Sequence, residues 1–286
     1  MAYTNFKPTI WSKQVQMDLA KLMVFREICN TNFQGEAGRG KTVKIVGISK
    51  PTVKTYVPGT AIAAAETPTD TSMELAINQY KYTNFLVDDV DDAQSHVDIM
   101  KSLMKGSAEQ HATVADSYIA GLLKDTSIAT AGNVLTATIT TPEDAKAAID
   151  EAFVKLWNAG VKTGKDTYIV VSPWFYSLFK NSLTEILTNN VEMVERGIFG
   201  MYNGAYVKMS NNVATDSGAD CIGVMTKDAI AYADGIEEVE AYRPQSSFSD
   251  AVKVLHTFGA KVVRPEQIVT IKATKGSASS SSSSNA

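Results

Sequence analysis

The segment GEAGRGKT, from Gly35 to Thr42, has residue types and a spacing that could bind a nucleotide. It fits the pattern G-x-x-x-x-G-K-[ST], in which backbone amides cradle the phosphates of ATP or GTP. Such a loop needs a buried strand before its first glycine and a helix that begins at its lysine. Here the polar CNTNFQ precedes the loop, and KTVKIVGI, a strand pattern, follows it. We therefore predict a turn at these glycines and keep nucleotide hydrolysis only as a remote alternative.

Several acidic and histidine residues have side chains that could bind a metal ion. The run AIAYAD ends at Asp234 and imitates a magnesium-binding strand, but any buried strand that meets a turn gives this pattern. DDVDD, which begins at Asp88, lacks the central Gly and terminal Glu of an EF-hand loop, so we interpret it as an acidic helix start. The histidines, His96, His111 and His256, show no H-x-x-x-H or H-E-x-x-H spacing. We predict that His111 is a packed side chain with a hydrogen-bond partner.

Three residues could act as nucleophiles. Cys29 and Cys221 are far apart in the sequence, and we expect both to be small buried hydrophobes rather than a disulfide or a nucleophile. Ser172, in VVSPWF, lacks the flanking glycines of a nucleophile elbow, and helix capping accounts for it. The sequence therefore predicts no catalytic, cofactor-binding or metal site, and a protein that is not an enzyme.

The composition is that of an ordinary globular protein, with 286 residues, 44% hydrophobic and 20% charged. The net charge is −4 and no basic cluster is present, which argues against a sequence-independent grip on nucleic acid. The N-terminal MAYTNFKPTIWSKQ lacks the plan of a secretory signal, and no apolar run reaches the roughly 20 residues that span a bilayer. We expect synthesis in the cytoplasm and no membrane partner.

The first third of the chain predicts a helix and then a long two-stranded excursion. Ser12 to Cys29 reads as an amphipathic helix capped by Ser12, and Thr42 to Ile48 reads as a strand. A second strand is predicted from Met73 to Val87, with Met73, Leu75 and Ile77 on one face. Because an isolated ribbon is marginal in water, we expect this excursion to find its cover on another molecule.

A long helix and a mixed region follow. From Val90 the apolar residues recur three and four apart, which predicts one helix of about 35 residues, roughly 50 Å long. A second helix is predicted between Thr141, its cap, and Gly160, with the buried face Ala145, Ile149, Ala152, Phe153, Leu156 and Trp157. Tyr168 to Val171 reads as a buried strand, a helix capped by Ser172 follows it, and short strands continue to about Lys275.

This order of elements resembles the major capsid proteins of tailed bacteriophages, whose Hong Kong 97-like fold the encapsulin shells share. The resemblance is carried by NFQGEAGRGKTVKI, QYKYTNFLVDDVDDAQSHVD, ATVADSYIAGLL, TYIVVSPWFYSLF and DAVKVLHTFGAKVVRPEQIV. These stretches are similar, in turn, to the exit from the N-terminal arm, the entry into the spine helix, the end of that helix, the start of the axial domain and the closing strands of the peripheral domain.

The resemblance implies an α+β fold in which each segment has a role. The segments would be an N-terminal arm at 1–36, an extended β-hairpin loop at 37–87, a peripheral domain with the spine helix at 88–140 and 237–275, an axial domain at 141–236, and a flexible Ser-rich tail at 276–286.

The implied function is structural self-assembly. Pentamers and hexamers of the chain would close an icosahedral head shell around double-stranded phage DNA, without sequence-specific binding. The shell would be assembled in the bacterial host cytoplasm, and the protein would end in the virion. Scaffolding, portal and cement proteins are the expected partners. Because the arm starts at once, a separate scaffolding protein or none is expected. An encapsulin-type nanocompartment with a protein cargo is the alternative.

The resemblance also raises the question of covalent cross-links. The family's founding member joins an extended-loop Lys to an Asn of the peripheral domain. Lysines are present here at Lys41, Lys44, Lys50 and Lys54, but the stretch from Arg243 to Lys272 contains no Asn, and Asp250 stands near the comparable place. We therefore expect a shell held by burial and hydrogen bonds or by a cement protein.

Overall fold

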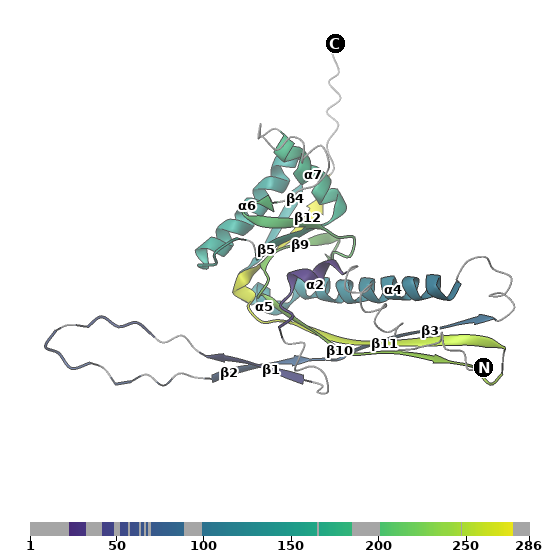
Figure 1. Cartoon of the computed structure of the whole chain (residues 1–286). Coiled ribbons are helices and arrows are strands. Elements are labelled where there is room, and N and C mark those ends of the chain that lie inside the picture. Colours follow the sequence, from purple (N-terminus) through teal and green to yellow (C-terminus); the bar gives the residue numbers. More distant parts are fainter. Residues whose placement is uncertain are drawn as a thin grey trace, which may run out of the picture.

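In a computed structural model the chain adopts the mixed α+β fold that the sequence predicts. Figure 1 shows its layers: a seven-stranded sheet with two helices stands over the long helix α4, and a three-stranded sheet lies along the other side of α4. A two-stranded ribbon extends away from both. The structure describes residues 23–32, 42–48, 52–56, 58–62, 64–65, 67, 70–88, 99–164, 166–184, 201–246 and 248–276.

The seven-stranded sheet is buried on both faces. On β5, Ile169 and Val171 face the core under helices α6 and α7, whereas Val170 faces the core around α2. This double burial explains why TYIVV is an uninterrupted hydrophobic run rather than an alternating one. In spatial order the strands are β4 (Val134–Ile139), β12 (Ile268–Lys275), β9 (Ala219–Thr226), β5 (Thr167–Val171), β7 (Ala205–Met209) and β6 (Met201–Tyr202), and β8 (Thr215–Asp216) pairs with β9.

Helix α6 (Pro142–Asn158) begins where the sequence predicts. The Asp144 amide donates to the Thr141 hydroxyl at 3.3 Å, and the Thr141 amide donates to the Asp144 carboxylate at 2.8 Å, which completes a capping box. Gly160, with φ 73°, ends the segment in the left-handed conformation that favours glycine. The predicted buried face is confirmed except at Trp157, which is 48% exposed.

Helix α7 (Pro173–Thr184) follows β5 as predicted. Phe175 and Phe179 are fully buried and join Phe153 of α6 in one core. Ser172 stands at the predicted cap position, but among the described residues its buried hydroxyl has no hydrogen-bond partner. The predicted side-chain cap is therefore absent from the described structure.

The three-stranded sheet packs on the long helix. Strands β10 (Ile230–Tyr242), β11 (Ser249–Val262) and β3 (Gln79–Asp88) are antiparallel, with β11 in the centre. The helix α4 (Ile99–Gly121) and the 3-10 turn η2 (Leu122–Lys124) that follows it end close to the predicted point, while the predicted start at Val90 lies outside the described residues. The contact between helix and sheet is apolar, through Met104, Ala108, Val239, Val252 and Val254.

The ribbon corrects two predictions. It consists of β1 (Thr42–Ile48) and β2 (Asp70–Ala76), and the predicted single strand from Met73 to Val87 is in fact β2 and β3, separated at Ile77–Asn78. The base of the ribbon is also covered by its own chain, because Val43 and Leu75 pack on β10. The expectation that the whole ribbon needs another molecule is therefore wrong for the base.

The segment around α2 (Val24–Ile28) lies between the two larger sheets. Its core takes in η2 and the helix α5 (Thr126–Thr130) and also holds Cys29 and Cys221, which are buried and free, as predicted. A second 3-10 turn, η3 (Pro265–Gln267), leads into β12. The predicted helix Ser12–Cys29 is confirmed only over α2, since residues 1–22 lie outside the described part of the chain.

The sheets divide the chain differently from the predicted domains. β4 lies in the predicted peripheral range 88–140 and β12 in the range 237–275, yet both are hydrogen-bonded members of the seven-stranded sheet.

Some features named in the sequence analysis lie outside the described residues. They are GEAGRGKT before Thr42, DDVDD after Asp88, His96, and the tail from residue 277. Among the described helices none combines the length and the apolar composition needed to cross a bilayer.

Candidate functional site

A buried carboxylate joins α2 to the helix α4. The amides of Val24 and Phe25 donate to the carboxylate of Asp116 at 2.8 Å and 3.2 Å, so Asp116 satisfies two of the free amides at the start of α2. Asp116 is only 1% exposed. Desolvation raises the pKa of this carboxyl to about 6, although the two amide hydrogen bonds oppose the shift.

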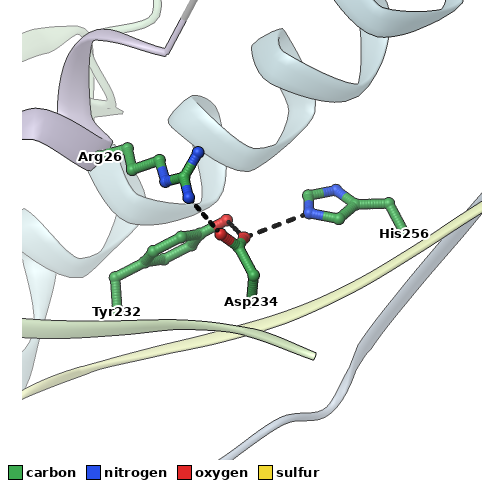
Figure 2. Close-up of polar contacts among 4 residues, drawn as sticks. All are labelled: Arg26, Tyr232, Asp234 and His256. Carbon is green, nitrogen blue, oxygen red and sulfur yellow. Dashed lines mark hydrogen bonds and ion pairs between the residues drawn. The ribbon is translucent and has the colours of Figure 1, made fainter. Parts of the chain in front are cut away.

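A second polar cluster joins α2 to the three-stranded sheet. Figure 2 shows Arg26, Tyr232 and His256 around the carboxylate of Asp234. The Arg26 guanidinium lies 2.9 Å from the carboxylate, His256 Nε2 lies 3.3 Å from it, and the Tyr232 hydroxyl donates to it. Desolvation raises the pKa of Asp234, but the hydrogen bonds from His256 and Tyr232 and the charge of Arg26 outweigh it and hold the pKa below its usual value.

This geometry gives Asp234 a structural role. Its carboxylate oxygens are engaged by side chains of the same subunit, and in the described part of the chain no group of three or more His, Cys, Asp or Glu residues could hold a metal ion. The resemblance of AIAYAD to a magnesium-binding strand thus has a local cause, since Asp234 precedes the β-bulge of β10.

The two described histidines are packed side chains. His111 Nε2 lies 3.2 Å from the Thr83 hydroxyl, which confirms the predicted hydrogen bond. Burial, and then the neighbouring His256, lower the pKa of His111 to about 4, so it is neutral at pH 7. The two rings meet edge to face at 5.9 Å. Both histidines therefore help to join α4 and β11.

The face of the three-stranded sheet that points away from α4 is exposed. On the edge strand β3, Tyr80, Tyr82 and Leu86 are 57%, 77% and 59% exposed and lie on one side because they alternate along the strand. Glu238 and Glu240 of β10 are exposed on the same face, opposite Leu255 and Lys253 of β11. We call these five residues (Tyr80, Tyr82, Leu86, Glu238 and Glu240) the outer stripe.

A second exposed apolar group lies in the described part of the loop between β1 and β2. Val53, Tyr56 and Ile62 are 98%, 62% and 80% exposed. Figure 1 shows this loop at the far end of the ribbon, away from the helices and the larger sheets. We call these three residues the loop tip. A group of large apolar side chains so far from its own core suggests a contact surface.

Solved structures share this arrangement. The capsid structure of the cyanophage P-SCSP1u matches with a TM-score of 0.67 at 15% sequence identity, and 89% of each chain is covered. A chain from Mycobacterium phage Che8 matches with a TM-score of 0.71 at 30% identity, over 87% of this chain and 90% of that one. This chain belongs to the tailed-phage major capsid proteins.

The Hong Kong 97-like fold predicted for this capsid protein is thereby confirmed. A virus-like particle from Pyrococcus furiosus matches as well, with a TM-score of 0.57 at 12% identity over 92% of this chain and 98% of that one, which shows the shared fold alone. No family model and no curated protein sequence matches the capsid protein.

The described end of the nucleotide-like motif fits a structural reading. Thr42 opens β1, where it lies opposite Ala76, so a strand follows the glycines as predicted.

The residues considered for a covalent cross-link are partly described. Lys44 and Lys54 lie within the described residues, and the Asp250 carboxylate lies 3.6 Å from Nε of Arg243. The absence of covalent cross-links stays a prediction.

The sequence did not reveal the polar anchors of α2. Asp116 and Arg26 are ordinary charged residues on predicted helices, and no local motif joins them to their partners 91 residues and more away. The outer stripe could have been predicted in part, because Tyr80, Tyr82 and Leu86 occupy alternate positions of the strand pattern QYKYTNFLV and therefore share one face.

Proposed function

We propose that many copies of this capsid protein close into an icosahedral head shell that encloses double-stranded phage DNA, and that the protein is a structural component of the virion. The observation that supports this most directly is the ribbon, which is anchored on its own subunit at the base and exposes the loop tip at the far end. Such a projection has its apolar surface covered only when another copy lies beside it.

The outer stripe of a neighbouring copy is the surface we assign to the loop tip. Residues 41–65 contain four lysines and no acidic residue, whereas the outer stripe carries Glu238 and Glu240 beside Tyr80 and Tyr82. Glu240 pairs with Lys253 on the same face, so Glu238 is the carboxylate we assign to a loop lysine. Opposite charge favours encounter, and the aromatic and aliphatic side chains on both sides supply area to bury.

The two larger sheets divide the remaining roles. We propose that the axial domain is the seven-stranded sheet with α6 and α7, and that it surrounds the fivefold and sixfold axes of pentamers and hexamers. The peripheral domain is α4 with the three-stranded sheet, and residues 1–36 form the arm. This places β4 and β12 in the axial domain, because their backbone hydrogen bonds lie there. A scaffolding protein, a portal and a cement protein are proposed partners.

Electron microscopy of the purified full chain tests the proposal. We expect rings or closed shells of uniform size from the wild-type protein. Replacement of residues 49–69 by a short Gly-containing turn is expected to leave a folded protein that forms no shells. A wider deletion from 43 to 80 is unsuitable, since it removes β1, β2 and the first residues of β3. A monodisperse wild-type monomer at high concentration, or intact shells without the loop, would contradict the proposal.

An encapsulin-type compartment is the second candidate, because the virus-like particle from Pyrococcus furiosus has the same fold. The contents of particles purified from the natural source separate the two functions. Nuclease-protected double-stranded DNA supports the phage capsid, whereas a protein cargo of defined size supports the compartment.

A further inference from the structure

The helix α2 contacts three parts of the subunit at once. Asp116 of α4 accepts the first two amides of α2, and Arg26 pairs with Asp234 of β10. On the side of the axial sheet, Glu27 pairs with Lys208 of β7. Directly after the helix, Asn30 forms a short parallel bridge with β10, through its amide to Ile230 and its carbonyl oxygen to the Tyr232 amide. The spine helix and both larger sheets are thus tied to one segment.

The apolar side chains of this segment complete the core between the two sheets. Met23, Phe25, Ile28 and Cys29 are each at most 1% exposed. They pack with residues of α4, β9 and β10. The five residues of α2 would not form a stable helix alone, so these contacts hold it in place.

We propose that residues Met23 to Asn30 form a separable clasp, which detaches as a unit from the spine helix and both sheets while the rest of the subunit stays folded, and that the Arg26–Asp234 pair is its main lock. The clasp lies within the predicted arm, 1–36, so its release would detach the described part of the arm from the rest of the subunit. That consequence rests on the proposed capsid function, but the detachment itself is a property of the single chain.

The pattern of hydrogen bonds supports a separable unit. Both larger sheets keep their described strand pairings without the clasp, because among the described residues its one backbone pairing with them is the bridge at Asn30. The contacts of the clasp are otherwise side chains and the Asp116 carboxylate. A segment held in this way can open as one unit while the sheets beneath it keep their hydrogen bonds, and its four buried apolar side chains set the cost of that opening.

The protein carries its own reporters for a test. Its two cysteines, Cys29 and Cys221, are both buried and free, but Cys29 belongs to the clasp and Cys221 lies within β9 of the seven-stranded sheet. The rate of maleimide labelling at each thiol can be followed by mass spectrometry on the full chain as purified. Variants with Cys29→Ser or Cys221→Ser assign each rate.

The variant Arg26→Met removes the charge and keeps most of the apolar stem. We expect it to raise the labelling rate of Cys29 by about 10- to 100-fold, since loss of one partner of a largely buried pair strongly favours opening. Cys221 lies in the core that the clasp completes, so its labelling rate should rise less than that of Cys29, while hydrogen exchange at the amides of β9 should stay unchanged because β9 keeps its strand pairings. The matched control is Glu27→Gln, which removes an exposed pair on the same helix and should change either rate by less than about threefold.

Wild-type protein gives a second, independent measurement if Arg26→Met does not fold. In low urea the labelling rate of Cys29 should rise with a smaller denaturant slope than hydrogen exchange at the amides of β9, because a local opening exposes less surface than global unfolding. Equal slopes for Cys29 labelling and β9 exchange, equal acceleration of both in Arg26→Met, or no acceleration of Cys29 would overturn the proposal. None of these readouts depends on whether shells form, so failure of the clasp is distinguishable from failure of the capsid assignment.

Discussion

The seven-stranded sheet buries its apolar side chains within the subunit, whereas the loop of the ribbon exposes them. In the sheet, Ile169, Val170 and Ile222 are fully buried, because α6 and α7 cover one face and the core around α2 covers the other. In the loop between the ribbon strands, Val53 is 98% exposed and Ile62 is 80% exposed. Residues of the same apolar type thus have opposite environments within one chain.

The difference separates what the subunit needs in order to fold from what it presents to other molecules. Changes in the sheet should alter the free energy of unfolding of the isolated chain, and changes in the loop should leave it almost unaltered. The base of the ribbon and the clasp stand between these extremes, since each joins a small segment to the main body. The expected effects therefore decrease from the sheet outward.

The largest effect is expected for Phe153→Ala. Phe153 lies on the buried face of α6 and contacts Tyr202, so its truncation leaves a cavity between the helix and the seven-stranded sheet. We expect a loss of about 4 kcal/mol in the free energy of unfolding and a fall of about 10 °C in Tm. Denaturant unfolding measures it, with the neighbouring half-exposed Val154→Ala as control at less than about 0.5 kcal/mol. Equal losses in both variants would show that α6 does not pack as described.

The junction between α4 and α2 should respond to pH through Asp116. The pKa of this buried carboxyl is raised from 3.8 to about 6, so the folded state holds its proton more tightly than the unfolded state does. The protonated carboxyl therefore contributes its full stabilisation below about pH 3.8, and this contribution is lost as the pH rises through about 6. The total loss in the free energy of unfolding is about 3 kcal/mol.

The variant Asp116→Asn isolates this contribution. Unfolding of both proteins in urea between pH 4 and pH 7.5 gives the difference in free energy of unfolding, in which the other titrating groups cancel. That difference, wild type minus variant, should fall as the pH rises from 4 to 7. Parallel curves would mean that Asp116 does not titrate in this range in the folded protein.

The base of the ribbon should be disturbed by Gly259→Ala. An added Cβ at Gly259 would overlap the carbonyl oxygen of Ala76 and lie 2.9 Å from the Cα of Ile77, so β2 would have to move. We expect the free energy of unfolding to fall by about 2 kcal/mol. Relative to wild type, hydrogen exchange should become faster in β2 and stay unchanged in β5. Gly106→Ala is the control, because a Cβ there meets nothing within 4 Å and alanine favours the helix. Unchanged exchange in β2 would contradict the described anchoring.

The same gradient explains which parts of the fold could be predicted from the sequence. The capping box of α6 and the hydrophobic run of β5 are local signals, and both elements begin where they were predicted. The strand from Met73 to Val87 was predicted as one piece because its residues have strand propensity throughout. The break at Ile77–Asn78 follows from pairing with two different partners, β1 and β11, and such long-range pairing leaves no local mark.

The domain limits and the clasp depended on contacts between distant residues. β12 pairs with β4 across more than a hundred positions, which no periodicity shows. Arg26 and Asp234 are likewise more than two hundred positions apart and meet only through tertiary packing. The order of elements was enough to predict the fold through the family resemblance, but it did not predict individual contacts between distant residues.

The smallest effect on folding, and the sharpest test of the comparison, is expected at the loop tip. The double variant Val53→Ser, Ile62→Ser should change the free energy of unfolding by less than about 0.5 kcal/mol, because these side chains are already in water in the isolated subunit. Shell formation, measured by electron microscopy and sedimentation, should nevertheless be lost. A charge swap identifies the surface that receives the loop: Lys54→Glu and Glu238→Lys should each weaken assembly, and together they should restore part of it, since the reversed pair attracts again. If the double swap assembles no better than either single variant, the loop tip contacts some surface other than the outer stripe, although the division between folding and assembly residues would still stand.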